Sequence, residues 1–74
     1  MYPYDLSGKN KYYTLYENLR GDILHGRIKS GEKLPGKRTL ARELGVSVVT
    51  VQTAYDQLLA EGYVRSRERS GYYV

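Results

Sequence analysis

Four closely spaced side chains in the second half of the sequence are of types that can bind nucleic acid. Val49, Thr50, Gln52 and Thr53 fall on one side of a helical segment, and the N-terminal part of that side carries no acidic residue. Hydroxyl and amide groups donate and accept hydrogen bonds, and a face without negative charge can approach phosphates without repulsion. The predicted chemistry is non-covalent binding to base edges and phosphates. The alternative is a helical hairpin whose outer face is simply solvated.

The helix that must position these side chains is predicted over Val48–Glu61. Ser47 precedes it, and the serine hydroxyl can cap the free N–H groups of the first turn. Gly62 ends it. Apolar side chains recur along the segment at helical spacing and form one stripe for the core: Val51, Ala54, Tyr55, Leu58 and Leu59.

A shorter helix is predicted immediately before it, over Lys37–Leu44. Gly36 is the expected cap residue, and Pro35 before it restricts the chain to an extended entry. Gly45 can take the left-handed conformation that ends a helix. Two helices joined by such a tight turn form a helix-turn-helix, whose second helix lies in the major groove of DNA.

A β-hairpin is predicted over Arg65–Val74, because two short β-branched or aromatic runs flank a polar segment with a glycine. Placed after a recognition helix, such a hairpin is a wing. Arg65, Arg67 and Arg69 are spaced by two, so in an extended strand they would share one face and could contact phosphates or the minor groove. The alternative is a solvated edge strand that its charge protects from aggregation.

A further helix is predicted in the N-terminal half of the chain. Thr14 and Glu17 match a capping box, which would start the helix near Leu15, and Gly26 would end it. A connector follows, with a very short strand expected at Lys33-Leu34.

These elements predict a mainly α fold with a small β-hairpin, a winged helix-turn-helix of three helices plus a wing. Residues 1–10 lack a helical period and are expected to be a flexible N-terminal arm, which leaves residues 11–74 as the domain. The sequence has nine tyrosines and no phenylalanine, tryptophan or cysteine. The core should therefore be aliphatic and tyrosine-based, with several tyrosines half-buried.

The composition favours a nucleic-acid partner over catalysis. The sequence has twelve Lys and Arg and eight Asp and Glu, which gives a net charge of +4. Residues 33–74 contain seven of the basic side chains and four of the acidic ones, so the positive excess lies in this part of the chain. With one histidine, no cysteine and scattered carboxylates, no acid–base pair or metal cluster is visible, so no enzyme is expected. The sequence has neither an apolar run near the roughly 20 residues of a membrane span nor a secretory leader, so we expect a cytoplasmic protein.

The motifs together resemble the DNA-binding domain of GntR-type bacterial transcription regulators over Tyr12–Val74. The pairing of Ala54-Tyr55 with Glu61-Gly62-Tyr63, together with the Ser70-Gly71 ending, is most similar to the MocR branch of that family. The matching elements occur in one order: Leu15 to Glu17, Ile23 to Ile28, Gly31 to Pro35, Arg38 to Ser47, Thr50-Val51, Ala54-Tyr55, Leu58, Glu61 to Tyr63 and Ser70 to Val74.

This resemblance implies sequence-specific binding of double-stranded operator DNA by a transcription regulator acting as a homodimer. In the MocR branch an aminotransferase-like domain that binds pyridoxal phosphate follows the DNA-binding domain. This sequence contains no such domain, so the chain is either an N-terminal fragment or belongs to a parent with a different or minimal effector part. We favour the fragment, and we expect no cofactor in this chain and control by an effector only through a domain that is absent here. The alternative is a winged-helix module for protein–protein contact without DNA binding.

The resemblance also implies which residues contact DNA: Arg38, Ser47, Val49, Thr50, Gln52 and the wing around Glu68 to Gly71. Two positions depart from the family pattern: Val48 stands where arginine is frequent, and Arg69 where glycine is usual. We therefore expect more affinity from the wing and less discrimination from the helix. The predicted DNA-binding residues are Lys37, Arg38, Ser47, Val49, Thr50, Gln52, Thr53, Arg67, Arg69, Ser70 and Gly71.

Overall fold

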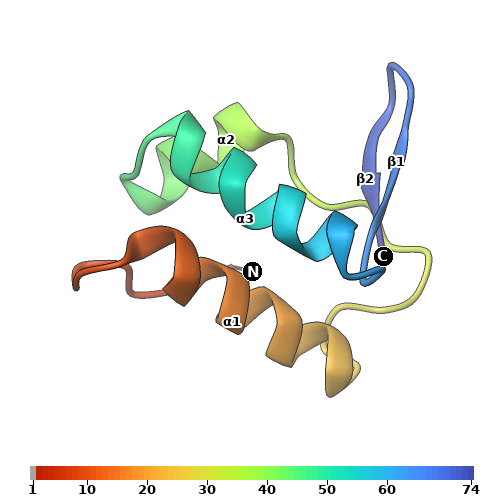
Figure 1. The fold of residues 1–74 in the computed structure, drawn as a ribbon, viewed down its shortest axis with the longest axis horizontal. Helices are drawn as coiled ribbons and strands as arrows, with labels where there is room; N and C mark the ends of the chain where they lie inside the picture. Colours follow the sequence, from red (N-terminus) through yellow and green to blue (C-terminus); the bar gives the residue numbers. More distant parts are fainter. Residues whose placement is uncertain (1) are drawn as a thin grey trace.

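The computed structural model describes residues 2–74, which form three helices and a two-stranded antiparallel sheet (Figure 1). The bounds are α1 Lys11–Leu24, α2 Lys37–Leu44, α3 Val48–Ala60, β1 Arg65–Arg67 and β2 Gly71–Tyr73. Helix α3 packs against both other helices, and the hairpin stands beside the C-terminal half of α3 (Figure 1). The predicted architecture of three helices plus a wing is confirmed. None of the helices described over residues 2–74 is long and apolar enough to cross a bilayer.

The two helices of the helix-turn-helix begin and end close to the predicted residues. Gly45 adopts φ 69°, and its N–H donates to the Ala41 carbonyl, which ends α2 in the left-handed conformation that glycine favours. The Ser47 Oγ accepts a hydrogen bond from the Thr50 N–H at 3.1 Å, so the predicted cap of α3 forms. Helix α3 ends at Ala60, one residue before the predicted end.

Helix α1 begins four residues earlier than predicted, at Lys11 instead of near Leu15. Asn10 takes the left-handed conformation, with φ 58°, and its carbonyl accepts from the Thr14 N–H at 3.1 Å. Asparagine tolerates this conformation, so the chain can turn directly into the helix without a side-chain cap. Thr14 therefore lies inside the first turn, and the predicted capping box with Glu17 is wrong.

The N-terminal segment is packed along the domain. Residues 2–10 form no helix or strand, but Leu6 is only 5% exposed and belongs to the core. The Tyr2 hydroxyl donates to Glu32, and the Tyr4 hydroxyl donates to Asp22. The predicted arm begins with Met1, which lies outside the described residues. The flexibility expected of the arm stays a prediction, whereas the structure shows where Tyr2 and Tyr4 pack, which the sequence left open.

The core joins the inner faces of all three helices to residues of the arm, the connector and the hairpin. Tyr55 is fully buried, and its hydroxyl donates to the Pro35 carbonyl at 2.8 Å. Tyr63 and Tyr72 are half-buried against the same core, as expected of tyrosines in a small domain. The buried residues are Leu6, Leu15, Tyr16, Leu19, Ile28, Leu34, Leu40, Ala41, Val51, Ala54, Tyr55, Leu58 and Val64.

The hairpin is held to the body of the domain by the connector. Lys33 forms an antiparallel bridge with Tyr73, and the Leu34 N–H donates to the Tyr72 carbonyl at 2.9 Å. The Val74 N–H donates to the Glu32 carbonyl at the same distance. The short strand expected at Lys33-Leu34 is therefore present as a single bridge, and it fixes β2 between β1 and the connector.

Candidate nucleic-acid interface

The N-terminal half of α3 presents small side chains to solvent. Val49 is 72% exposed, Thr53 is exposed, and Thr50 is half-buried. The Thr53 hydroxyl donates to the Val49 carbonyl at 2.8 Å, which leaves its oxygen lone pairs available to a ligand. No acidic residue occurs in α3 before Asp56. This part of the helix can therefore approach a polyanion closely.

Gln52 lies on the same helix but is held by three neighbours. Its Oε1 accepts from the Lys37 ammonium at 2.6 Å, and its Nε2 donates to Asp56 at 2.8 Å and to the Tyr72 hydroxyl at 3.0 Å. The side chain is half-buried. Gln52 is thus a junction between α2, α3 and the wing, and not the free outward amide that we expected.

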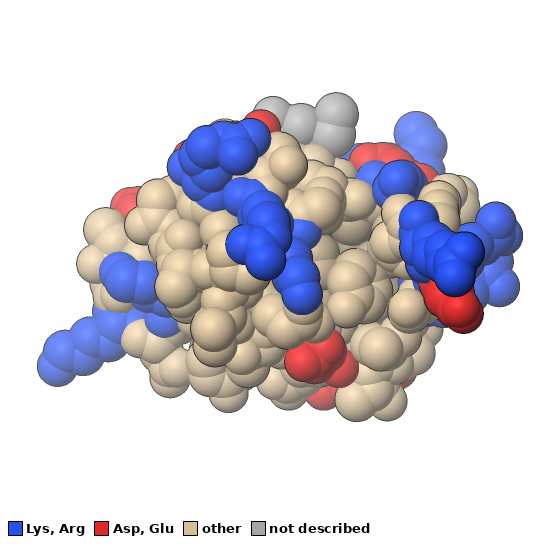
Figure 2. Space-filling model, turned by 90° about the horizontal axis from the view of Figure 1, so that it is seen from above, with Lys and Arg blue, Asp and Glu red and all other residues tan. Residues whose placement is uncertain are grey.

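Positive side chains flank this helix on the side of α2. Lys37 and Arg38 occupy the first turn of α2, and Arg42 lies one turn later; all three are exposed. Figure 2 looks down on the side of the molecule from which the hairpin projects, and it shows Lys and Arg gathered over the body of the domain and again at the hairpin. Mostly uncharged surface separates the two groups (Figure 2).

The wing arginines do not share one face, and that prediction is wrong. The Tyr72 ring contacts Tyr55 of α3, with centroids 5.1 Å apart. Because side chains alternate along a strand, the face of Arg65 and Arg67 is turned away from α3. Arg69 lies instead in the turn with φ 61°, because residues 68–70 close the hairpin and the Ser70 N–H donates to the Arg67 carbonyl.

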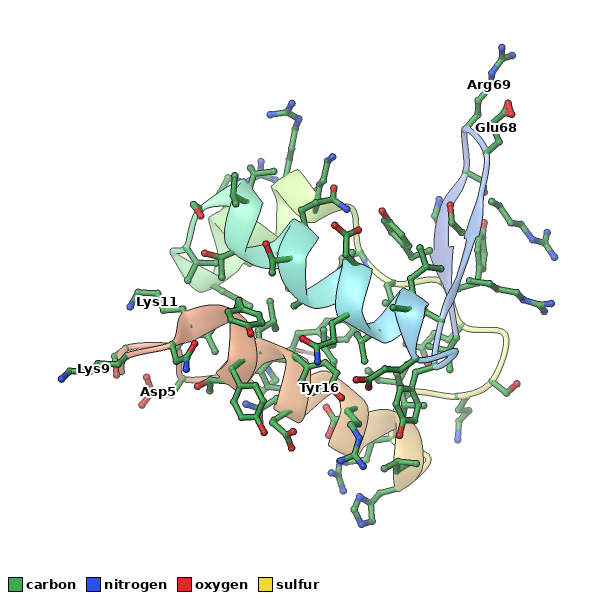
Figure 3. The ribbon with its side chains drawn as sticks, in the orientation of Figure 1. Asp5, Lys9, Lys11, Tyr16, Glu68 and Arg69 are labelled. Atoms are coloured by element: carbon green, nitrogen blue, oxygen red, sulfur yellow. The ribbon has the colours of Figure 1, made fainter. Side chains whose placement is uncertain are left out.

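The two kinds of wing arginine therefore have different surroundings. The Arg67 guanidinium stacks over the Tyr73 ring, 5.1 Å from its centroid, and the hydroxyls of Tyr73 and Ser70 are hydrogen-bonded. Figure 3 shows Arg69 and Glu68 at the tip, pointing away from the helices. Arg69 is thus the arginine at the wing tip, whereas Arg67 is held against Tyr73 on the strand.

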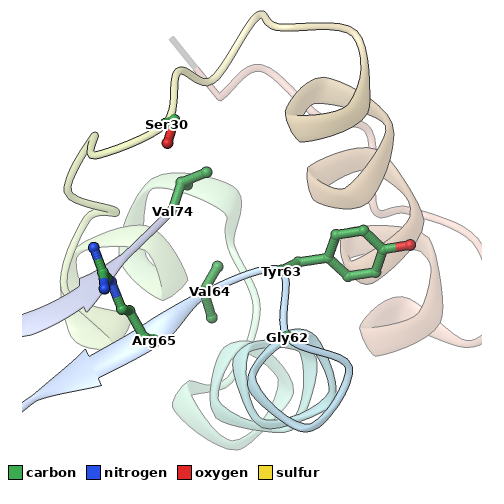
Figure 4. Close-up of a pocket in the computed structure, with 6 residues that line it drawn as sticks. All are labelled: Ser30, Gly62, Tyr63, Val64, Arg65 and Val74. Atoms are coloured by element: carbon green, nitrogen blue, oxygen red, sulfur yellow. The ribbon is translucent and has the colours of Figure 1, made fainter.

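Arg65 lines a hollow at the base of the hairpin (Figure 4). The hollow has a volume of about 280 Å³. Its lining residues are Ser30, Gly62, Tyr63, Val64, Arg65 and Val74. Arg65 thus belongs to a different surface from the exposed part of α3.

Titrating groups with shifted pKa values lie away from the exposed part of α3. A hydrogen bond from Tyr16 lowers the pKa of Glu61, and the same bond, together with burial, raises the pKa of Tyr16 to about 12. Burial, followed by the bond to Asp22, raises the pKa of Tyr4. These pKa shifts arise from hydrogen bonds between segments and from burial, and none of them suggests an acid or base poised for catalysis.

The structure brings most of the predicted set together. Lys37, Ser47 and the α3 residues form one continuous surface, and Arg69 and Ser70 lie at the wing tip. Gly71 adopts φ 130°, a backbone conformation that L side chains rarely adopt, so another residue there would strain the chain. Our sequence reasoning missed Tyr72, although its alternation with Tyr73 could have indicated that one of the two faces α3.

Comparison with known proteins identifies the family. The model of "Bacterial regulatory proteins, gntR family" matches residues 11–74. The probable rhizopine catabolism regulatory protein MocR of Rhizobium meliloti is 55% identical over 60 residues, which are 81% of this chain and 12% of MocR. The uncharacterized HTH-type transcriptional regulator YdeL of Bacillus subtilis is 48% identical over 63 residues, 85% of this chain and 14% of YdeL. The matched part of the chain thus spans only 12–14% of the length of these relatives.

Solved structures share the same fold. YtrA from Sulfolobus acidocaldarius, a GntR-family transcription factor, superposes with a TM-score of 0.87 at 36% identity, covering 99% of this chain and 78% of YtrA. The AraR DNA-binding domain, solved in complex with operator ORX1, superposes with a TM-score of 0.82 at 28% identity, covering 97% of this chain and 87% of that one. The chain therefore belongs to the gntR family of bacterial regulatory proteins, with the winged-helix fold of that family's DNA-binding domains.

Proposed function

We propose that this domain binds double-stranded operator DNA sequence-specifically as part of a transcription regulator. The observation that carries the proposal is the surface formed by the N-terminal half of α3, which is exposed, free of acidic residues and flanked by Lys37 and Arg38. A surface of this size, shape and charge suits the major groove, into which a recognition helix fits. The family membership and the operator complex of AraR support it.

The contacts divide into those that position the domain and those that read sequence. Ser47 and Thr50 suit phosphate oxygens, Arg38 suits a base edge or a phosphate, and the Gln52 carbonyl oxygen suits a base edge. The wing tip, with Arg69 and Ser70, reaches the backbone or the minor groove. Arg67 supports the tip by stacking on Tyr73. Because Val48 is half-buried against the core, it contributes little to discrimination between bases.

The proposal is tested by measuring affinity for operator and random DNA across a salt series. Arg69→Ala should weaken binding to both kinds of DNA and flatten the dependence of log K on log salt. A variant that contacts one phosphate fewer releases fewer counterions from the DNA when it binds. Arg67→Ala should do the same to a smaller extent. Gln52→Ala should chiefly reduce the preference for the operator.

One result would contradict the proposal of DNA binding, and a second would contradict only the role given to the wing. Binding that is absent at low salt would favour the alternative of a protein–protein module. Unchanged affinity in both wing variants would leave DNA binding intact but remove the role given to the wing. Lys29→Ala is the matched control, because it removes one exposed positive charge in the connector after α1.

Regulation is proposed to depend on segments outside these 74 residues. We propose that two copies of the domain bind related half-sites as a homodimer, and that an effector domain elsewhere sets their spacing. The relatives' much greater length supports this arrangement. The hollow at the base of the hairpin does not fit pyridoxal phosphate, because its lining includes no lysine to form a Schiff base. Binding to chromosomal DNA would place the regulator in the cytoplasm.

A further inference from the structure

The orientation of the Gln52 amide is fixed by the chemistry of its neighbours. The Lys37 ammonium can only donate hydrogen bonds, so the atom that it contacts at 2.6 Å must be the carbonyl oxygen. Asp56 can only accept, so the atom 2.8 Å from its carboxylate must be the nitrogen. A reversed amide would place donor against donor and acceptor against acceptor. Both neighbours therefore select one orientation.

This orientation uses both hydrogens of the Gln52 nitrogen inside the protein. One donates to Asp56, and the other donates to the Tyr72 hydroxyl at 3.0 Å. The carbonyl oxygen accepts once, from Lys37, and keeps a second lone pair. In this arrangement the side chain offers DNA one acceptor and no donor.

A glutamine that reads adenine alone needs both an acceptor and a donor. The carbonyl accepts from the adenine N6 amino group while the nitrogen donates to adenine N7. With only the acceptor available, Gln52 can match any base that presents an amino hydrogen in the major groove. Those bases are adenine and cytosine, whereas guanine and thymine present acceptors there.

Tyr72 can keep the Gln52 amide in this orientation because the position of Tyr72 is itself fixed. Its ring packs edge-on against the buried Tyr55, and its carbonyl accepts from the Leu34 N–H at 2.9 Å. The phenol oxygen is thereby fixed above Gln52 by the core and by the connector. The bond to Asp56 is charge-assisted and shorter, so the Tyr72 bond is the one that decides whether a donor is free.

We propose that Tyr72 of the wing is a specificity-determining residue that positions Gln52, so that Gln52 accepts a hydrogen bond from adenine or cytosine instead of reading adenine alone. The proposal rests on the DNA-binding function above and deepens it. The wing then has two roles: its tip contributes affinity, and its inner face sets which bases the recognition helix accepts.

The test compares base preference in the wild type, Tyr72→Phe and Gln52→Ala. Sites are first selected from a random DNA pool by the wild-type domain. The position read by Gln52 is the one whose preference Gln52→Ala abolishes, and all four base pairs are then measured there. The wild type should bind adenine and cytosine within about threefold of each other, and both about tenfold more tightly than guanine or thymine.

Tyr72→Phe keeps the ring against Tyr55 but frees one hydrogen of the Gln52 nitrogen. The preference for adenine over cytosine at that position should rise to about tenfold, the size of one added base contact. Tyr63→Phe is the matched control, since it loses a phenol that accepts from Arg20 at 3.1 Å and should leave base preference unchanged. Comparing the thermal unfolding of both variants with the wild type checks that each remains folded.

The outcomes separate this proposal from the proposed function. An unchanged base preference in folded Tyr72→Phe would overturn it, as would an adenine-only preference in the wild type. If Gln52→Ala left the base preference unchanged at every position of the site, the proposal about Tyr72 and Gln52 would be overturned, while the proposed operator binding would stand. A wild-type domain that selects no sequence at all would refute the proposed function itself, and the role of Tyr72 with it.

Discussion

At the scale of single residues, Val48 and Arg69, the two positions expected to depart from the family pattern, lie in different structural surroundings. Val48 is half-buried and packs against the core, so it presents an apolar side chain at the start of α3. Arg69 occupies a left-handed backbone position, φ 61°, which glycine adopts without cost and arginine does not. The wing therefore places a cation at its tip at the expense of backbone strain.

Arg69→Gly should stabilise the fold and weaken DNA binding together. Relief of the left-handed strain is worth about 1 kcal/mol in the free energy of unfolding, after allowance for the added flexibility of glycine. Loss of the charge should lower affinity for operator and random DNA alike. Urea denaturation and a DNA titration at fixed salt measure the two effects.

Glu68→Gly is the control for this change. Glu68 lies in the same turn without a positive φ, so glycine there relieves no strain and should lower stability by up to about 1 kcal/mol. It also removes a negative charge and should not weaken DNA binding. If both variants changed stability in the same direction, the strain assigned to Arg69 would be refuted.

Arg38→Ala should reduce the free energy of operator binding by about 1–3 kcal/mol, the range of an arginine–base contact. Arg38 is exposed in the first turn of α2, beside Lys37, so the substitution removes no core contact. The measurement is the dissociation constant for operator DNA, compared with that of Lys29→Ala. A loss no larger than in Lys29→Ala would show that Arg38 contributes only general charge.

At the scale of elements, the helix-turn-helix depends on how α3 begins. The first turn of a helix leaves N–H groups without partners, and Ser47 satisfies one of them through Thr50. The same turn carries Val49 and the hydroxyls of Ser47 and Thr50, which are themselves 2.9 Å apart. Stability and the proposed phosphate contacts thus share one pair of side chains.

Ser47→Ala should lower the free energy of unfolding by about 1 kcal/mol, the usual loss for a helix N-cap. Urea denaturation followed by circular dichroism measures the change. Ser66→Ala is the control, because Ser66 is an exposed residue of β1 whose side chain forms no hydrogen bond within residues 2–74. Equal effects in the two variants would mean that the cap does not stabilise α3.

At the scale of the whole molecule, tyrosine hydroxyls tie distant segments together around a small core. Tyr16 links α1 to Glu61 at the end of α3, and Tyr4 links the N-terminal segment to Asp22. Tyr55 links α3 to the chain before α2. In a domain of 74 residues without disulfides, such bonds supplement a core that is small for its surface.

The Tyr16 bond should make stability fall at both extremes of pH. The pKa of Tyr16 is raised from 10.0 to about 12, so above pH 10 the unfolded chain loses this proton first, and stability falls until about pH 12. The pKa of Glu61 is lowered from 4.5, so its contribution is present above that pH and is lost as the pH falls below it.

In Tyr16→Phe, the free energy of unfolding should fall less than in the wild type when the pH is moved from 7 to either the acidic or the alkaline side. The measurement is urea denaturation at acidic, neutral and alkaline pH. Tyr12→Phe is the control, since Tyr12 lies on the outer side of α1 and its hydroxyl has no hydrogen-bond partner within residues 2–74. A Tyr16→Phe profile as steep as the wild type at both ends would exclude the Tyr16–Glu61 bond as its cause.

The sequence alone determined the elements whose signals are local. The apolar stripe of α3, the serine cap before it and the glycine that ends α2 act within a few residues, so their bounds were predicted to within one residue. The hairpin and its place after α3 followed from equally local turn signals. The motifs that resemble the GntR family lie in these same elements.

Only the tertiary structure decided which groups meet across elements. Helix α1 extends to Lys11 because Asn10 takes a left-handed conformation, and the N-terminal segment is held by Leu6 in the core. Spacing by two predicted one arginine face, but the turn at residues 68–70 separates Arg69 from the strand. The bonds of Gln52 to Lys37 and Tyr72 join residues 15 and 20 positions away, and spacing along a chain carries no signal for such contacts because packing in three dimensions creates them.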